Sequence, residues 1–344
     1  MEPAAAIEQL RDTATPARTG DATARRIADV HALFGDDMAR VNELLSAAVR
    51  DGLHPATESA RHLLDAGGKR IRPLALLLSA ACFGPIGDPA RDLAVVAELI
   101  HLATLLHDDV VDDGTERRGQ VASRIVWGNA VSVLAGDLLL THALERTRRV
   151  ATPGVLEELL STLRKLVDGE VVQLRGRTTL DVRRATYFQI VENKTASLFV
   201  WAARAGAATA HAPRHCLEAL GSYGAHVGLA FQLVDDALDY AADPRLTGKT
   251  LHGDLREGKI TLPLILAAEQ DRHLIVDIQS AREGDAEAAL RIASAVQELR
   301  ACDAVRQLAV QETQRALACL GALPPSTARE LLASIARELV ARAG

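Results

Sequence analysis

Cysteine and aromatic residues are scarce in this sequence, which has 344 residues. The four cysteines form no Cys-x-x-Cys pair, so we expect reduced, mostly buried thiols and no disulfide scaffold; they are Cys82, Cys216, Cys302 and Cys319. Phenylalanine, tyrosine and tryptophan make up only 3% of the residues. Alanine and leucine must therefore fill the core, which favours helices over a β-sandwich, because strands prefer β-branched and aromatic residues.

Long apolar runs and an excess of positive charge are also absent. The longest apolar run, residues 74–82, is far shorter than the about 18 residues that span a bilayer. The first residues contain no apolar stretch and carry Glu2, Glu8 and Asp12, so we expect neither a signal peptide nor a transit peptide. With 39 Lys and Arg against 45 Asp and Glu, the net charge is −6, which argues against nucleic acid as a partner. These features predict a soluble, cytoplasmic protein.

What the sequence has instead is helical periodicity. Residues 1–24 lack it and are expected to be a loose tail, whereas apolar residues recur at helical spacing over residues 25–344. We find no strand–helix alternation, no internal repeat and no glycine-rich phosphate loop of the P-loop or dinucleotide type. Breaks rich in Gly, Pro or Asp fall at residues 52–55, 84–89, 153–154, 212–213 and 243–248. We therefore predict an all-α protein of about ten or more helices in a single domain.

Two aspartate clusters carry the strongest functional signal. The first, HDDVVDD, spans residues 107–113, and the second, QLVDDALD, spans residues 232–239; both contain the pattern DDxxD. Each comes at the end of a strongly apolar helical segment, where a solvated charge run would not usually begin. On a helix, positions i, i+1 and i+4 lie within about 100° of arc, so we expect three carboxylates on one face of each helix.

These clusters are electrostatically costly without a cation. Like charges on one helix face repel one another, and the dipole at a helix C-terminus adds to the repulsion. Oxygen ligands in this number suit Mg²⁺, which also shares phosphate oxygens with a substrate. One such cluster is equally consistent with a solvated helix end. Two of them on similar apolar helices favour the metal interpretation.

Basic residues are interleaved with the aspartates along the chain. They comprise the segment GGKRIRP (67–73), Arg117, Arg118, Lys194, Lys249 and Lys259. Each alone is more often a surface charge, but backbone freedom at the glycines and the forked donors of arginine suit a diphosphate. Among two carboxylate clusters in an acidic protein, they predict a site that holds Mg²⁺ and polyphosphate together.

In their order, these segments resemble those of the polyprenyl synthetase family, the trans-isoprenyl diphosphate synthases. The resemblance covers roughly residues 65–265 and includes GGKRIRP (67–73), ELIHLATLLHDDVVDDGTERRG (98–119), NKTASLF (193–199), GLAFQLVDDALDY (228–240) and GKTLHGDLREGK (248–259). The family implies the isoprenoid synthase type I fold, a single large helical bundle around a deep apolar cavity. It also implies that isopentenyl diphosphate and an allylic diphosphate are joined by ionisation, condensation and elimination.

The resemblance gives individual residues expected roles. The expected Mg²⁺ ligands, for roughly three ions with substrate bound, are Asp108, Asp112 and Asp235, with Asp109, Asp236 and Asp239 beside them. The expected diphosphate ligands are Arg117, Lys194 and Lys249 for the allylic substrate and Lys69, Arg72, His101 and Arg118 for isopentenyl diphosphate. Thr195 and Gln232 are expected near the ionising carbon, with Lys259 as a further substrate ligand. His101 is also explained as an ordinary helix histidine. Glu170 and Gln173 match the family string GEVVQL (169–174), but Glu170 is also explained as a structural hydrogen-bond partner.

The length of the product depends on the residues below the first cluster. Ala103 and Thr104 stand five and four residues before Asp108, where short-chain members of the family typically carry an aromatic floor. Because both are small here, the resemblance implies a long chain, about C35–C50 by analogy. A bulky residue elsewhere, such as Phe83 or Trp127, would close the tunnel earlier.

Three other interpretations stay open. Ala103 and Thr104 argue against a short-chain farnesyl or geranylgeranyl diphosphate synthase, and the two intact clusters argue against a non-catalytic partner subunit. The GGKxxRP element argues against a terpene cyclase. The family also implies a homodimer and a strongly apolar product that partitions to the membrane.

Overall fold

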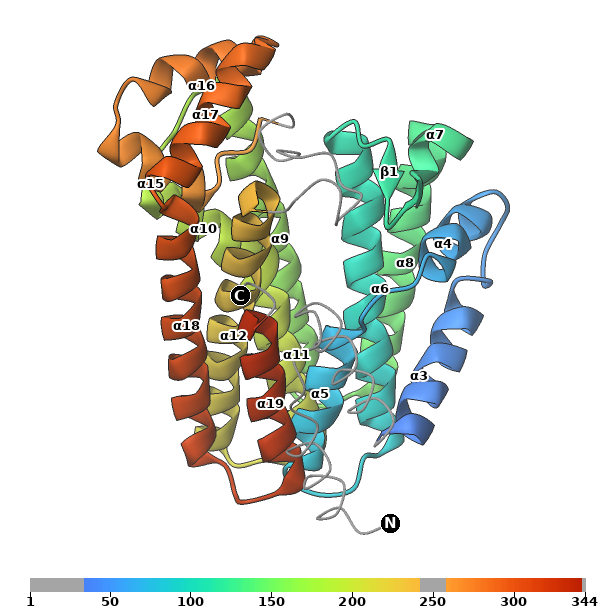
Figure 1. Cartoon of the computed structure of the whole chain (residues 1–344). Coiled ribbons are helices and arrows are strands. Elements are labelled where there is room, and N and C mark those ends of the chain that lie inside the picture. Colours follow the sequence, from blue (N-terminus) through green and yellow to red (C-terminus); the bar gives the residue numbers. More distant parts are fainter. Residues whose placement is uncertain (1–33, 242–257, 342–344) are drawn as a thin grey trace.

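The computed structural model describes residues 34–241 and 258–341, which fold into a bundle of mostly long helices (Figure 1). The first half of the bundle contains α3 (Gly35–Ala48), α4 (Ala56–Asp65), α5 (Ile71–Ala81), α6 (Asp88–Val111), α7 (Ser123–Trp127), α8 (Asn129–Val150) and α9 (Val155–Thr178). The second half contains α10 (Arg184–Val191), the π-helix η1 (Glu192–Ala196), α11 (Ser197–Thr209), α12 (Arg214–Ala241), α15 (Leu262–Gln270), α16 (Leu274–Arg282), α17 (Ala286–Glu298), α18 (Ala301–Cys319), the 3₁₀ turn η2 (Leu320–Ala322) and α19 (Thr327–Ala341). The prediction of an all-α fold is confirmed. The expected tail, residues 1–24, lies outside the described residues.

One small hairpin, which no pattern in the sequence predicts, interrupts the helices. Strands β1 (Glu116–Arg117) and β2 (Gln120–Val121) pair antiparallel between α6 and α7. The two turn residues, Arg118 and Gly119, have φ of 54° and 74°, the left-handed geometry of a two-residue turn that matches strand twist. Strands of two residues are too short for any alternation in hydrophobicity to reveal. The hairpin matters because it fixes the backbone from which Arg117 and Arg118 reach the site.

Helix α6 carries the first aspartate cluster and runs through the core. Its apolar residues Leu93, Val96, Leu99 and Leu106 are fully buried. The helix begins with a proline in its first turn and ends at Val111; the C-cap residue Asp112 still donates its N–H to the carbonyl of Asp108. The next residue, Asp113, has a φ of 53°, so the chain turns away from the helix axis there. The aspartates therefore occupy the last turn of a rigid, buried element.

Helix α11 lies in the centre and belongs to two of the three apolar clusters of the core. A Cβ on Gly206 of α11 would lie 2.1 Å from the carbonyl oxygen of Leu76 in α5, and one on Gly224 of α12 would lie 2.6 Å from that of Phe199 in α11. Only glycine permits these backbones to approach so closely. The glycines thus set the spacing of three helices around the site.

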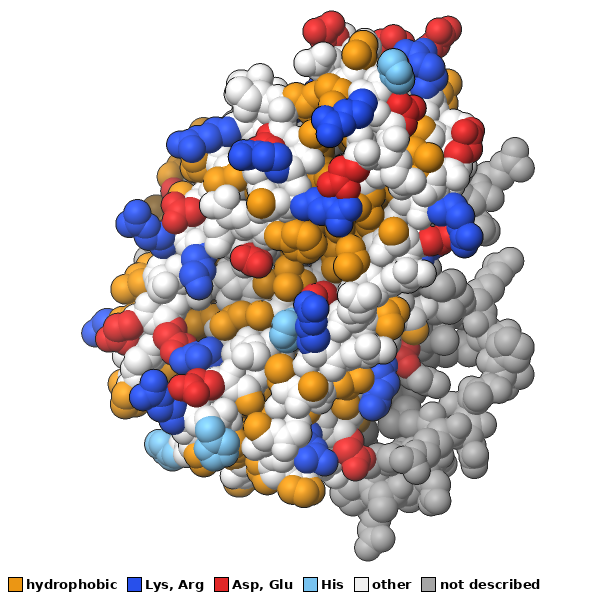
Figure 2. All heavy atoms as spheres, turned by 90° about the vertical axis from the view of Figure 1, so that its left-hand side faces the viewer, with side chains coloured by type: hydrophobic (Ala, Val, Ile, Leu, Met, Phe, Trp, Pro, Cys, Tyr) orange, Lys and Arg blue, Asp and Glu red, His pale blue; other side chains and the backbone are white. Residues whose placement is uncertain are grey.

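The surface of the bundle is mixed in charge on the side that carries α18, where Lys and Arg are interspersed with Asp and Glu (Figure 2). Among the described helices, none combines the length and hydropathy that a membrane span requires.

Candidate active site

A cavity of about 680 Å³ opens between α6 on one side and α9, α10, η1 and α12 on the other. Of the residues singled out in the sequence, its lining includes Arg72, His101, Thr104, Asp108, Arg117, Lys194, Thr195, Gln232, Asp235, Asp236 and Lys259. Segments far apart in the sequence therefore meet in one place. Apolar groups such as Leu105, Ile190 and Phe231 complete the wall. Lys249 lies outside the described residues.

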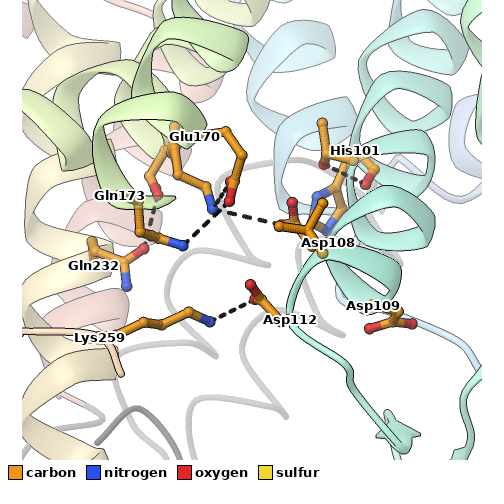
Figure 3. A network of polar contacts seen from close by, with 12 residues as sticks. His101, Asp108, Asp109, Asp112, Glu170, Gln173, Gln232 and Lys259 are labelled. Atoms are coloured by element: carbon orange, nitrogen blue, oxygen red, sulfur yellow. Dashed lines mark hydrogen bonds and ion pairs between the residues drawn. The ribbon is translucent and has the colours of Figure 1, made fainter. Parts of the chain in front are cut away.

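The first aspartate cluster divides between two sides of α6. Asp108 lines the cavity. The Asp112 carboxylate forms an ion pair with Lys259 Nζ at 2.9 Å (Figure 3). Asp109 points elsewhere. Its side chain is 1% exposed, and its carboxylate accepts a hydrogen bond from Arg117 Nε at 2.7 Å. The prediction that all three carboxylates share one face is wrong for Asp109. The physical reason is that position i+1 lies about 100° around the helix, whereas position i+4 lies only about 40° away.

Neighbouring charges and burial change the acidity of Asp108 and Asp112 in opposite directions. Burial raises the pKa of Asp108 to about 6, with Lys194 opposing the rise and Glu170 adding to it. Lys194 lies 3.9 Å from Asp108 and is also paired with Glu170. Burial alone would raise the pKa of Asp112, but Lys259 and other nearby cations hold that pKa below its usual value. Cations of this chain thus outweigh burial at Asp112, whereas burial outweighs Lys194 at Asp108.

The two neighbouring aspartates of the second cluster differ in burial, although both line the cavity. Asp235 is half-buried, whereas Asp236 is 2% exposed and accepts hydrogen bonds from the Tyr187 hydroxyl at 2.6 Å and the Gln232 amide at 2.8 Å. Burial raises the pKa of the Asp236 carboxyl, and the two hydrogen bonds oppose that rise. Asp239 lies one turn further along α12 and is half-buried.

A chain of hydrogen bonds links the second cluster to the π-helix. The Thr195 hydroxyl donates to the amide oxygen of Gln232 at 2.8 Å, and the amide nitrogen of Gln232 donates to Asp236. Lys194 and Thr195 lie within η1, and a Cβ on Gly169 of α9 would lie 2.9 Å from Lys194 Cγ. Single π-turns inside α-helices are frequent at functional sites. No pattern in the sequence predicts this turn.

The predicted isopentenyl diphosphate ligands lie beside α6, but not all line the cavity. The Arg72 guanidinium lies 4.7 Å from the centre of the Phe199 ring, and burial lowers the pKa of Arg72 to about 10. Burial, together with the positive charges of Arg72 and Arg118, holds the pKa of His101 well below its usual value. His101 is therefore neutral at pH 7. Arg118 donates to the Gly67 carbonyl. Lys69 is exposed and outside the lining.

The two chain-length candidates differ in position. Ala103 is fully buried among core residues, whereas Thr104 lines the cavity and donates its hydroxyl to the His101 carbonyl at 2.8 Å. Three residues that sequence reasoning did not assign to the site also shape it: Glu170 pairs with Lys194, Arg177 pairs with Asp112, and Tyr187 bonds Asp236. Only Glu170 had a signal in the sequence, its match to a family string.

A helical bundle in which one cavity brings together residues of two aspartate clusters and several cations is the arrangement of the all-α isoprenoid synthases. The model of the polyprenyl synthetase family matches residues 54–299 of this chain. The chain belongs to the polyprenyl synthetase family, as its motifs indicated, and is therefore a prenyltransferase.

Individual relatives align with this chain over nearly their whole length. Octaprenyl diphosphate synthase of Escherichia coli (strain K12) is 35% identical over 321 residues, which cover 91% of this chain and 98% of that protein. Heptaprenyl diphosphate synthase component 2 of Geobacillus stearothermophilus is 35% identical over 308 residues, 89% of this chain and 96% of that protein. The crystal structure of polyprenyl synthase from Caulobacter crescentus CB15, complexed with calcium and isoprenyl diphosphate, has a TM-score of 0.87 at 38% identity and covers 92% and 98% of the two chains.

Proposed function

We propose that this chain is a Mg²⁺-dependent trans-polyprenyl diphosphate synthase that condenses isopentenyl diphosphate with an allylic diphosphate. The observation that carries the proposal is that Asp108 of α6 and Asp235 of α12 line the same cavity as Arg117, Lys194 and Lys259. Carboxylates alone would bind a metal, and cations alone would bind an anion. Both together suit a metal-bound diphosphate.

The donors present fit Mg²⁺, for which Asp108, Asp112 and Asp235 are the proposed ligands. Among the described residues, no three His, Cys, Asp or Glu side chains are grouped closely enough to enclose a metal. The carboxylate oxygens suit Mg²⁺, which binds through one or two carboxylates, keeps several waters and takes further oxygens from substrate phosphates. Bound Mg²⁺ supplies charge neutralisation for the leaving diphosphate. That a structure related at 38% identity contains calcium and isoprenyl diphosphate supports this choice.

The chain's own residues have three proposed tasks. Lys194 and Arg117 bind and orient the allylic diphosphate, and Arg72 binds isopentenyl diphosphate. Thr195 and Gln232, held together by their hydrogen bond, direct fixed dipoles at the carbon that becomes cationic. Apolar wall residues such as Phe231 exclude water, which would otherwise quench the cation. The released diphosphate is the proposed base for the final proton loss.

We further propose a long-chain product, about C35–C50 by analogy. Ala103 and Thr104 support it, because neither places an aromatic ring below the first cluster. Relatives that are 34% or 35% identical carry names from geranylgeranyl to nonaprenyl diphosphate synthase, so identity alone does not select a length.

The test is product analysis with the purified chain alone, farnesyl diphosphate, labelled isopentenyl diphosphate and Mg²⁺, followed by dephosphorylation and chromatography. A ladder that ends at or beyond heptaprenyl length is expected. Products that end at C15–C20, tested with a geranyl or dimethylallyl primer, would support the proposed reaction. They would contradict the proposal that no side chain below the first cluster limits the length of the product. No incorporation would instead favour a subunit that needs a partner, the arrangement that the words "component 2" in one relative's name describe.

We also propose a homodimer and a cytoplasmic location, with a product that partitions to the membrane. Helices α8 and α9 support the homodimer, because each carries more than one exposed apolar side chain, with the largest exposed fractions being 60% for Leu134 and 62% for Val167. Light scattering after size-exclusion chromatography tests the dimer, with Leu134→Glu and Val167→Glu expected to favour the monomer. Cell fractionation tests the location.

A further inference from the structure

The strongest unexplained feature of the site is that the Asp112 carboxylate forms ion pairs with two basic side chains from different parts of the chain. Lys259, on the segment that precedes α15, approaches one carboxylate oxygen at 2.9 Å. Arg177, in the last turn of α9, pairs with the other oxygen through Nη2. The carboxylate is consequently only 4% exposed. A proposed metal ligand is thus already occupied by side chains of the same protein.

Arg177 is positioned to do this by a second contact. Its Nη1 donates to the carbonyl of Val111 at 2.8 Å, so one guanidinium ties both the backbone and a side chain at the end of α6 to the end of α9. Bidentate contacts of this kind give arginine a fixed geometry that lysine lacks. Nearby, Arg282 donates to the carbonyls of Gly176 and Gly258, which holds the end of α9 against the segment that carries Lys259.

The two cations differ in what else they can contact. Lys259 lines the cavity, so a bound diphosphate can draw it away from Asp112. Arg177 is not among the residues that line the cavity, and its side chain is 25% exposed. Asp112 is not among those residues either, so a diphosphate in the cavity contacts Lys259 before it contacts the Asp112–Arg177 pair. A cation that binds the Asp112 carboxylate must therefore displace Arg177.

We propose that Arg177 is a positioning residue that masks Asp112 in the metal-free protein and thereby lowers the affinity of the empty site for Mg²⁺. This inference rests on the proposed function, in which Asp112 is a metal ligand. A metal that binds Asp112 must compete with the positive charge already paired there, and the cost of separating that pair is subtracted from the binding free energy. Removal of Arg177 should consequently strengthen metal binding, although it removes a contact from the structure.

The experiment is isothermal titration of MgCl₂ into the chelator-treated, substrate-free chain. The Arg177→Gln variant is expected to bind Mg²⁺ about tenfold more tightly than the unaltered chain, which corresponds to about 1.4 kcal/mol. The matched control is Arg175→Gln, which removes the same charge from the same helix. Arg175 is exposed and lines the cavity, and no ion pair between it and an aspartate is found among the described residues. Its substitution is expected to change the Mg²⁺ dissociation constant less than twofold.

A second background separates masking from a general electrostatic effect. In an Asp112→Asn chain the carboxylate that Arg177 masks is gone, so Arg177→Gln is expected to leave the remaining Mg²⁺ affinity unchanged. Arg177→Lys keeps the charge without the fork and is expected to lie between the unaltered chain and Arg177→Gln; it replaces Arg177→Gln if that variant does not fold by circular dichroism.

The outcomes distinguish this inference from the proposed function. If the unaltered chain binds Mg²⁺ and Arg177→Gln binds it equally or more weakly, the masking role is wrong while the metal site stands. Equal tightening by Arg175→Gln would also overturn it, because the effect would then be one of net charge. If neither the unaltered chain nor any variant binds Mg²⁺ without substrate, the masking role is wrong, because no metal then competes with Arg177 in the substrate-free chain; the product assay tests the proposed function separately.

Discussion

The buried carboxylate of Asp108 makes a quantitative prediction about the metal-free protein. Its pKa of about 6 exceeds the ordinary 3.8, and at about 1.4 kcal/mol per pKa unit the difference corresponds to about 3 kcal/mol. An acid whose pKa is raised by folding stabilises the folded state fully below pH 3.8 and loses that contribution as the pH rises through 6. Ionised Asp108 therefore destabilises the metal-free fold above pH 7. The substitution Asp108→Asn removes this penalty.

Urea denaturation followed by circular dichroism, in chelator at pH 4.5, 6 and 8, measures the effect. The advantage of Asp108→Asn over the unaltered chain is expected to be small at pH 4.5 and about 3 kcal/mol at pH 8. The control is Asp113→Asn, which removes a carboxylate of the same cluster that is 82% exposed rather than buried, so no comparable gain in stability is expected. Adding Mg²⁺ should stabilise the unaltered chain more than Asp108→Asn, because binding to the folded state adds to stability. A pH dependence identical in the two chains would refute the reasoning.

Three further substitutions test other parts of the structure. Tyr187→Phe removes the hydroxyl that donates to buried Asp236 and should cost about 1–3 kcal/mol in the free energy of unfolding, measured by urea denaturation. Gly206→Ala places a Cβ against the Leu76 carbonyl and should lower stability by about 1–3 kcal/mol in a thermal melt; an unchanged melting temperature would contradict the packing described. Thr104→Phe introduces a ring into the cavity lining and should shorten the product on chromatography, and persistent long products would show that the floor lies elsewhere.

Much of the site was predictable from local sequence alone. The DDxxD clusters, the GGKRIRP segment and Lys194 are short strings whose chemistry needs no neighbour to be recognised. Their placement around one cavity agrees with that prediction for Asp108, Asp235 and Lys194. The roles of individual residues remain proposals.

Other features of the site were not predictable, because they depend on partners distant in the chain. Arg177 meets Asp112 across 65 residues of sequence, and Tyr187 meets Asp236 across 49. Whether Asp109 turns toward the metal or toward Arg117 depends on where the hairpin returns. No periodicity along a single helix contains that information.

The sequence by itself determined the helical class and the family, because helical periodicity and metal-binding motifs are local patterns of side-chain chemistry. Only the tertiary structure decided which carboxylates face the cavity and which are buried as structural acceptors. It also decided that Lys259 and Arg177 reach Asp112 before any metal does. The physical reason is that helix packing, set by close contacts such as Gly206 against Leu76, aligns side chains from separate helices to within hydrogen-bond distance.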